Sequence, residues 1–201
     1  MNYRILDPMY KIAIMVFPDA EELDFVGPFE TLASVEKFHS NSLQVDLIGK
    51  SLDPIKGFNG LRVLPDITFS ESEQYNILII PGGHGRNKAM HDDEVLNFVK
   101  EQVDGLSYLC SVCTGAFVLA EAGVLKGLKA TTHHTALDEL MRSYPDIEVV
   151  EKRVVKNDTE PKIWLAGGVS SGIDLSLELI SELFDKELKK KVAERLEYQP
   201  R

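Results

Sequence analysis

Apolar and polar residues along this chain follow two repeating patterns. Four short runs are almost continuously apolar, which is typical of strands buried on both faces of a parallel sheet. They cover residues 11–17, 43–48, 76–80 and 108–112. Between them, apolar residues recur at helical spacing over 29–38, 92–103 and 116–122. Strands that alternate with helices need crossover connections, so helices are expected on both faces of a parallel sheet.

The second half of the chain continues this alternation. Further strands are expected at 130–132, 148–155 and 163–166. Further helices are expected at 135–142, 173–184 and 187–196. Asn59 and Gly60 lie within residues 54–66 and predict a small hairpin there. No repeat, low-complexity stretch or linker interrupts the pattern, which predicts one α/β layered domain over residues 1–201.

Charge and composition argue against several classes of partner. The chain carries 22 basic and 32 acidic side chains, and its net charge of −10 argues against nucleic acid or an anionic membrane as main partner. No apolar run approaches the roughly 20 residues that span a bilayer. Residues 1–8 contain no apolar stretch of signal-peptide length, so a cytoplasmic protein is expected. Neither a nucleotide-binding glycine motif nor a cluster of metal ligands occurs, so no cofactor and no metal are expected.

Cys113 is the strongest candidate for chemistry. It follows the apolar run 108–112 and precedes a helical segment that contains Gly115, an order that predicts a tight turn exposing the thiol above the sheet. The helix N-terminus behind it is expected to favour the thiolate. Cys110 lies within the strand and is expected to be an inert core residue. A redox pair with Cys113 is disfavoured, because redox dithiols have both cysteines at the helix start.

Asp24 is the candidate acid or base. It follows the first predicted strand and is flanked by Leu23, Phe25 and Val26, so its carboxyl is expected to be partly desolvated. Desolvation raises the pKa of a carboxyl and lets it exchange a proton near neutral pH. The simpler alternative, a solvated acid that favours the following helix N-terminus, suits the neighbours Glu21 and Glu22 better.

Gly82 and Gly83 follow the predicted strand 76–80. A pair of glycines there lets the backbone approach a ligand closely and direct its N–H groups toward it. The amides of Gly83 and Thr114 are predicted to hold a developing anion beside the Cys113 sulfur. A plain turn from strand to helix is the alternative.

His133 and His134 follow the predicted strand 130–132. Either could pair with a catalytic cysteine. Neighbouring side chains on a strand point to opposite faces, so at most one of the two is expected to face the site. His133 is the candidate for substrate binding.

Taken together, these motifs resemble the ThiJ/PfpI superfamily, which is related to class I glutamine amidotransferases. The resemblance covers nearly the whole chain and rests on Glu21-Glu22-Leu23-Asp24, Pro81-Gly82-Gly83, Cys113-Thr114-Gly115, Thr131-Thr132-His133 and the segment 167–174. It implies a flavodoxin-like three-layer sandwich with a nucleophile elbow, and it implies a homodimer. Members of the protease branch carry histidine directly after the nucleophile, where this chain has Thr114.

Within the superfamily, residues 23–28 together with 111–115 look like the isonitrile hydratase branch. This resemblance implies a small electrophilic substrate, with Cys113 attacking an isonitrile carbon, Asp24 supplying a proton and Thr114 hydrogen-bonding the intermediate. Two alternatives stay open. The thiol could act on 2-oxoaldehydes, as in the glyoxalase III and deglycase branch, although that branch usually has Glu in place of Asp24. It could instead serve as a non-catalytic oxidation sensor.

Overall fold

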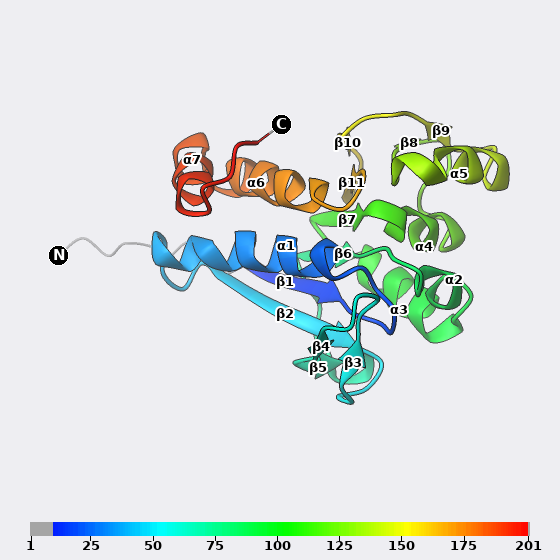
Figure 1. Ribbon diagram of the computed structural model, residues 1–201, viewed down its shortest axis with the longest axis horizontal. Helices are drawn as coiled ribbons and strands as arrows, with labels where there is room; N and C mark the ends of the chain where they lie inside the picture. The colour runs from blue at the N-terminus through cyan, green and yellow to red at the C-terminus, as the bar shows by residue number, and fades with distance from the viewer. Residues whose placement is uncertain (1–9, 201) are drawn as a thin grey trace.

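A mostly parallel sheet forms the centre of the protein (Figure 1). The structure is a computed structural model that describes residues 10–200, so residues 1–8, where no targeting signal is expected, lie outside the described part. In the described part, seven strands pair in the order β10-β11-β7-β6-β1-β2-β5. Only β10 is antiparallel to its neighbour. The strands are β1 (Tyr10–Met15), β2 (Leu43–Gly49), β5 (Ile67–Thr68), β6 (Ile77–Ile80), β7 (Tyr108–Val112), β10 (Val154–Asn157) and β11 (Lys162–Ala166).

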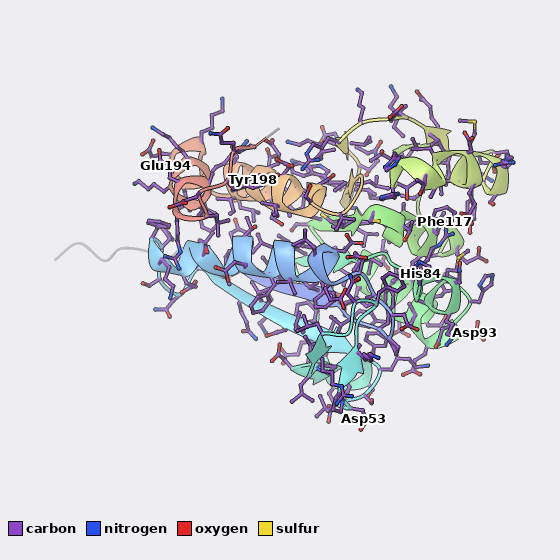
Figure 2. All side chains as sticks on the ribbon, viewed as in Figure 1. Asp53, His84, Asp93, Phe117, Glu194 and Tyr198 are labelled. Atoms are coloured by element: carbon purple, nitrogen blue, oxygen red, sulfur yellow. The ribbon has the colours of Figure 1, made fainter. Side chains whose placement is uncertain are left out.

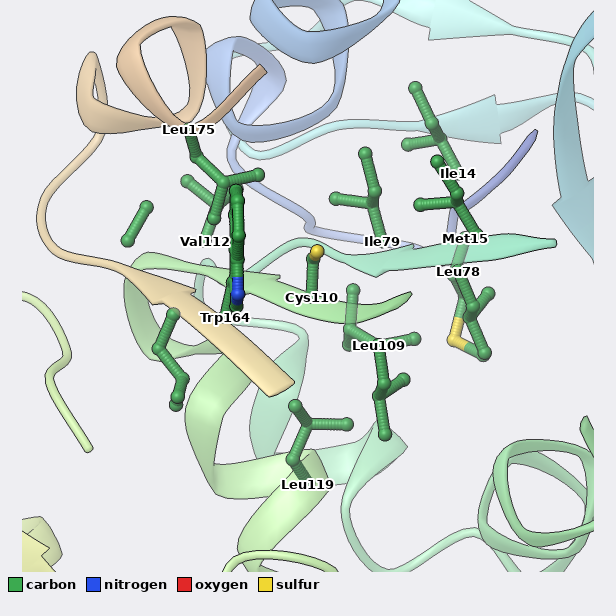
Figure 3. Packing of buried hydrophobic residues seen from close by; sticks show 14 of the residues in the cluster. Ile14, Met15, Leu78, Ile79, Leu109, Cys110, Val112, Leu119, Trp164 and Leu175 are labelled. Atoms are coloured by element: carbon green, nitrogen blue, oxygen red, sulfur yellow. The ribbon is translucent and has the colours of Figure 1, made fainter. Parts of the chain in front are cut away.

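Helices cover both faces of this sheet, as the alternating pattern predicts. Figure 3 shows Val112 and Leu175 packed on the side of α6, while Leu109 and Leu119 meet on the side of α4. One face carries α1 (Glu22–Ala33) and α6 (Ser171–Leu183), and the other carries α3 (Asp93–Val103) and α4 (Ala116–Glu121). Short helices α2 (Arg86–Ala89) and α5 (Leu137–Ser143) lie near α4, and α7 (Lys186–Arg195) packs on α6. The predicted three-layer α/β sandwich is confirmed. Within residues 10–200, no helix is both long and apolar enough to cross a membrane.

The strand predicted at 148–155 is wrong, because it is two strands in different sheets. Its first part is β9 (Glu148–Val149), which pairs with β8 (Lys129–Ala130) away from the central sheet. Its last residues belong to β10, which pairs with β11. The chain has to turn between these two partners. The hairpin predicted within 54–66 is confirmed, as β3 (Ile55–Lys56) and β4 (Arg62–Val63) pair antiparallel.

The first helix begins at Glu22 and not at residue 29, so the predicted start is wrong and Asp24 lies in the first helical turn. Pro28 sits inside α1 and removes one backbone hydrogen bond, which ordinarily ends a helix. Contact with α6 stabilises the helix here. A Cβ added to Gly172 of α6 would lie 3.1 Å from Pro28 Cγ, and one added to Gly27 would lie 3.2 Å from Ile173 Cγ1. Glycines on both helices therefore let their backbones approach closely.

This contact predicts that Gly172→Val destabilises the protein. The branched side chain would overlap the Pro28 ring and Val112 Cγ1, which lies 3.2 Å from the position of an added Cβ. We expect the free energy of unfolding to fall by ~1–3 kcal/mol, as overpacking usually costs. Ser181→Val on the same helix, at a half-buried position, is the control. Urea titrations with equal losses in both variants would contradict the close contact.

Candidate active site

Cys113 occupies a strained turn between β7 and α4. Its φ is +56°, in the left-handed region that residues other than glycine rarely adopt. Two hydrogen bonds hold the turn: the Cys113 N–H donates to Gly167 O at 2.8 Å, and Thr132 Oγ1 donates to Cys113 O at 2.8 Å. The geometry matches the predicted nucleophile elbow.

The carboxyl of Asp24 lies buried against the Cys113 thiol. Asp24 has no exposed surface, and the thiol interacts with it as a hydrogen-bonding and electrostatic neighbour. Its Oδ2 accepts the Gly82 N–H at 3.0 Å. Its Oδ1 is buried and, among the residues described, has no other hydrogen-bond partner in standard geometry. A hydrogen bond donated by the Cys113 S–H would satisfy this oxygen.

Burial decides the protonation of this pair. Burial raises the pKa of Asp24 to about 7. The negative charge of Glu21 also raises this pKa, while the hydrogen bond from the Gly82 N–H lowers it. Burial also raises the pKa of the Cys113 thiol to about 12, and the neighbouring Asp24 charge adds to this. The expectation that the turn favours the thiolate is therefore wrong, because desolvation and a nearby carboxylate outweigh the donors at the helix start. Below about pH 7 both groups hold their protons; above it the pair holds one proton, on the thiol, and the two titrations are coupled.

Thr114 and the two glycines support the pair. Burial opposes charge on the sulfur, but the Thr114 N–H and hydroxyl interact with it and favour its anion. The Gly83 N–H donates to Thr114 Oγ1 at 3.0 Å, while the Gly82 N–H is taken by Asp24. In this structure the glycine amides therefore orient Thr114 and Asp24. A Cβ on Gly82 would lie 2.4 Å from Thr114 N, so only glycine fits at this position.

The two histidines lie side by side, which contradicts the expectation that they point to opposite faces. The strand ends at Ala130, and His133 precedes a short 3₁₀ turn, His134–Ala136, so strand alternation does not apply. Their ring centroids are 4.3 Å apart. His133 lines the cavity at Cys113 as well as a neighbouring cavity, and His134 lines the neighbouring one. Burial, and then the nearby His134, lower the pKa of His133 and favour its neutral form.

The cavity that opens onto Cys113 has a volume of about 330 Å³. Its wall includes Phe58 and Glu139, which sequence reasoning missed, beside Glu21, His84 and Arg86. Arg86 Nη2 donates to both Glu139 oxygens at 2.7 Å, and its guanidinium lies 3.7 Å from the centre of the Phe117 ring. Figure 2 shows His84 and Phe117 on the same side of the molecule, where α2 and α4 meet. No local pattern marks Phe58 and Glu139, which come from a hairpin loop and from helix α5.

A metal centre would need a cluster of ligand side chains. Among residues 10–200 there is no group of three or more His, Cys, Asp or Glu side chains that could hold a metal ion. Both cysteines are free thiols. Cys110 is fully buried within β7, as predicted. The acid–thiol pair remains the candidate reactive centre.

Comparison with known proteins places the chain in a family. The model of the DJ-1/PfpI family matches residues 10–182. The chain belongs to the DJ-1/PfpI family. It is 35% identical to isonitrile hydratase from Pseudomonas putida, over 94% of this chain and 79% of that protein. It is 25% identical to the glutathione-independent glyoxalase DJR-1.2 from Caenorhabditis elegans, over 86% of this chain and 89% of that protein.

A solved structure shows the same fold. The crystal structure of a ThiJ/PfpI family protein from Pseudomonas syringae superposes with a TM-score of 0.86 and 32% sequence identity. The match covers 98% of this chain and 78% of that one. The resemblance found in the sequence motifs is thereby confirmed at the level of family and fold.

The buried carboxyl predicts an unusual dependence of stability on pH. The folded-state pKa of Asp24, about 7, lies above its ordinary value of 3.8, so the folded protein binds this proton more tightly than the unfolded chain does. Its contribution to stability is complete below pH 4 and is lost as the pH rises through about 7. We expect Asp24→Asn to raise the free energy of unfolding by ~1–3 kcal/mol at pH 8.

The comparison is made by urea titration at pH 4 and pH 8. The gain should be present at pH 8 and absent at pH 4. Asp158→Asn, at a side chain that is 94% exposed, controls for the loss of one negative charge. A gain of equal size at both pH values, or one shared by Asp158→Asn, would show that Asp24 is not destabilised by its ionisation.

Proposed function

We propose that this protein is a cysteine-dependent hydratase that converts an isonitrile into an N-substituted formamide. The observation that carries the proposal is the buried pair of Cys113 and Asp24, with Cys113 lining a small cavity. The 35% identity to isonitrile hydratase supports it. The volume of about 330 Å³ suits a small molecule.

An isonitrile carbon must gain both a nucleophile and a proton, and the pair provides both. Cys113 Sγ bonds to the terminal carbon while its proton passes to Asp24, and Asp24 returns a proton to that carbon. The product is a thioimidate, R–N=CH–S–Cys. Water then adds to the carbon, and the C–S bond breaks to release R–NH–CHO and the thiol. The net reaction adds one water to the isonitrile.

Burial makes attack by Cys113 depend on proton transfer to Asp24. A free thiolate is scarce because the pKa of Cys113 is raised to about 12 by burial and by Asp24, so attack is favoured when Asp24 accepts the proton as the C–S bond forms. The Thr114 amide and hydroxyl then stabilise negative charge on the sulfur.

The alternatives are less well supported. A peroxide sensor needs an accessible thiol with a low pKa, whereas Cys113 is 5% exposed and its pKa is raised by burial. Conversion of 2-oxoaldehydes would use the same thiol to form a hemithioacetal, and the glyoxalase relative motivates a lactate assay beside the main test. The homodimer implied by the family resemblance stays a prediction for sedimentation experiments, and the cytoplasmic location stays one for cell fractionation.

Formamide production from cyclohexyl isocyanide by the purified protein tests the proposal. We expect product from the wild type and none from Cys113→Ala, because the thiol forms the covalent intermediate. Cys110→Ala should retain activity, since Cys110 is sealed within β7. No product from the wild type, or equal product from Cys113→Ala, would overturn the proposal, and lactate from methylglyoxal would then favour the glyoxalase alternative.

The pH profile gives a second prediction. The reactive form holds one proton on the pair, and this form prevails above the pKa of Asp24, which burial raises to about 7. We expect kcat/KM to rise with pH through about 7 and to level off above it. Asp24→Asn should remove this inflection and lower kcat/KM by ~10²-fold or more. An inflection that persists in Asp24→Asn would assign it to another group.

A further inference from the structure

The tip of the β3–β4 hairpin forms one wall of the catalytic cavity. Phe58 lies in the loop between the two strands, and it lines the cavity together with His84. Their rings stack face to face, with centroids 4.2 Å apart and planes 3° from parallel. Phe58 nevertheless stays 46% exposed. An exposed aromatic side chain held in a fixed orientation beside a nucleophile is an apolar surface available to a ligand.

The hairpin tip is fastened to helix α1 through Glu22. Its Oε1 accepts the N–H groups of Asn59 at 2.7 Å and Leu61 at 3.3 Å, and its Oε2 accepts Asn59 Nδ2 at 2.7 Å. The Phe58 N–H also donates to Ala20 O at 2.9 Å. Four hydrogen bonds thus seat the tip on the segment that carries Asp24. The position of Phe58 is linked through α1 to the position of the catalytic acid.

The rest of the cavity wall is mostly polar, apart from the smaller apolar side chains of Ala136 and Val169. Arg86 is paired with Glu139, and the wall also carries the carboxylate of Glu21, which accepts Asn59 Nδ2 at 3.1 Å. Phe58 is the largest apolar side chain on the wall. An apolar group on a substrate therefore gains most by packing on Phe58, and an anionic group would meet Glu21.

We propose that Phe58, stacked on His84 and seated by Glu22, is the specificity-determining wall of the site and selects substrates whose substituent is an apolar ring. Phe58 contacts the ring, and Glu22 is a positioning residue that acts through the hairpin. This inference rests on the proposed isonitrile hydration for its substrate class. The wall itself is also open to any reagent that reaches the Cys113 thiol.

Steady-state kinetics with two isonitriles test the wall. Phe58→Ala should raise KM for cyclohexyl isocyanide about tenfold, with kcat within about twofold, because the ring loses its packing surface. Methyl isocyanide, which does not reach the wall, should keep its kcat/KM within about twofold. Phe58→Tyr should restore the preference for the ring. Leu64→Ala, at a 61% exposed position of the same hairpin outside the cavity, should change neither substrate.

Glu22→Ala should reproduce the Phe58→Ala pattern, and the double variant should lose no more than either single one, because both changes act on the same contact. Equal losses for both isonitriles, or the same pattern in Leu64→Ala, would overturn the proposal. Thermal unfolding of each variant verifies that the domain stays folded.

A second arm does not depend on isonitrile turnover. Intact-mass spectrometry follows alkylation of Cys113 by iodoacetamide and by N-benzyl iodoacetamide, with Cys110 shielded in the core. The ratio of benzyl to unsubstituted rates should fall about tenfold in Phe58→Ala and stay unchanged in Leu64→Ala. If the wild type makes no formamide but this ratio falls, the proposed function fails and the wall stands. An unchanged ratio would overturn the wall.

Discussion

The contact between the Asp24 carboxyl and the Cys113 thiol is the constraint on which this structure depends. Both groups are removed from water, so neither carries a charge cheaply, and two negative charges side by side would cost far more. Above about pH 7 the pair therefore keeps one proton, on the thiol, and one negative charge, on Asp24. Such a pair suits attack coupled to proton transfer better than attack by a free thiolate.

Several segments distant in sequence hold this contact together. Gly82, 58 residues beyond Asp24, donates its N–H to the carboxyl, and Gly167 and Thr132 hold the backbone of Cys113 in its strained turn. Close packing of α1 on α6 holds in place the helix that carries Asp24. The fold thus stabilises a charged site that is unfavourable by itself, which is the usual relation between active sites and the scaffolds around them.

Local patterns predicted what depends on neighbours in sequence. Continuous apolar runs identified the buried parallel strands, and the order of strand, thiol and glycine located the elbow at Cys113. The same reasoning failed where tertiary contacts override local preference. Apolar spacing placed the first helix at residues 29–38, whereas packing on α6 keeps α1 helical from Glu22 through Pro28. The two histidines were assigned to a strand that ends before them.

The sequence by itself predicted the layered fold, because apolar and polar residues recur at short, regular spacing. Its motifs also carried the family resemblance and named the candidate thiol and acid. Only the tertiary structure decided the protonation of the pair and the roles of Gly82 and Gly83, since burial and hydrogen bonding are set by many segments together. It also brought Phe58 and His84 into contact across the cavity. No spacing in the chain encodes that meeting, because the two residues come from separate loops whose relative position follows from the whole fold.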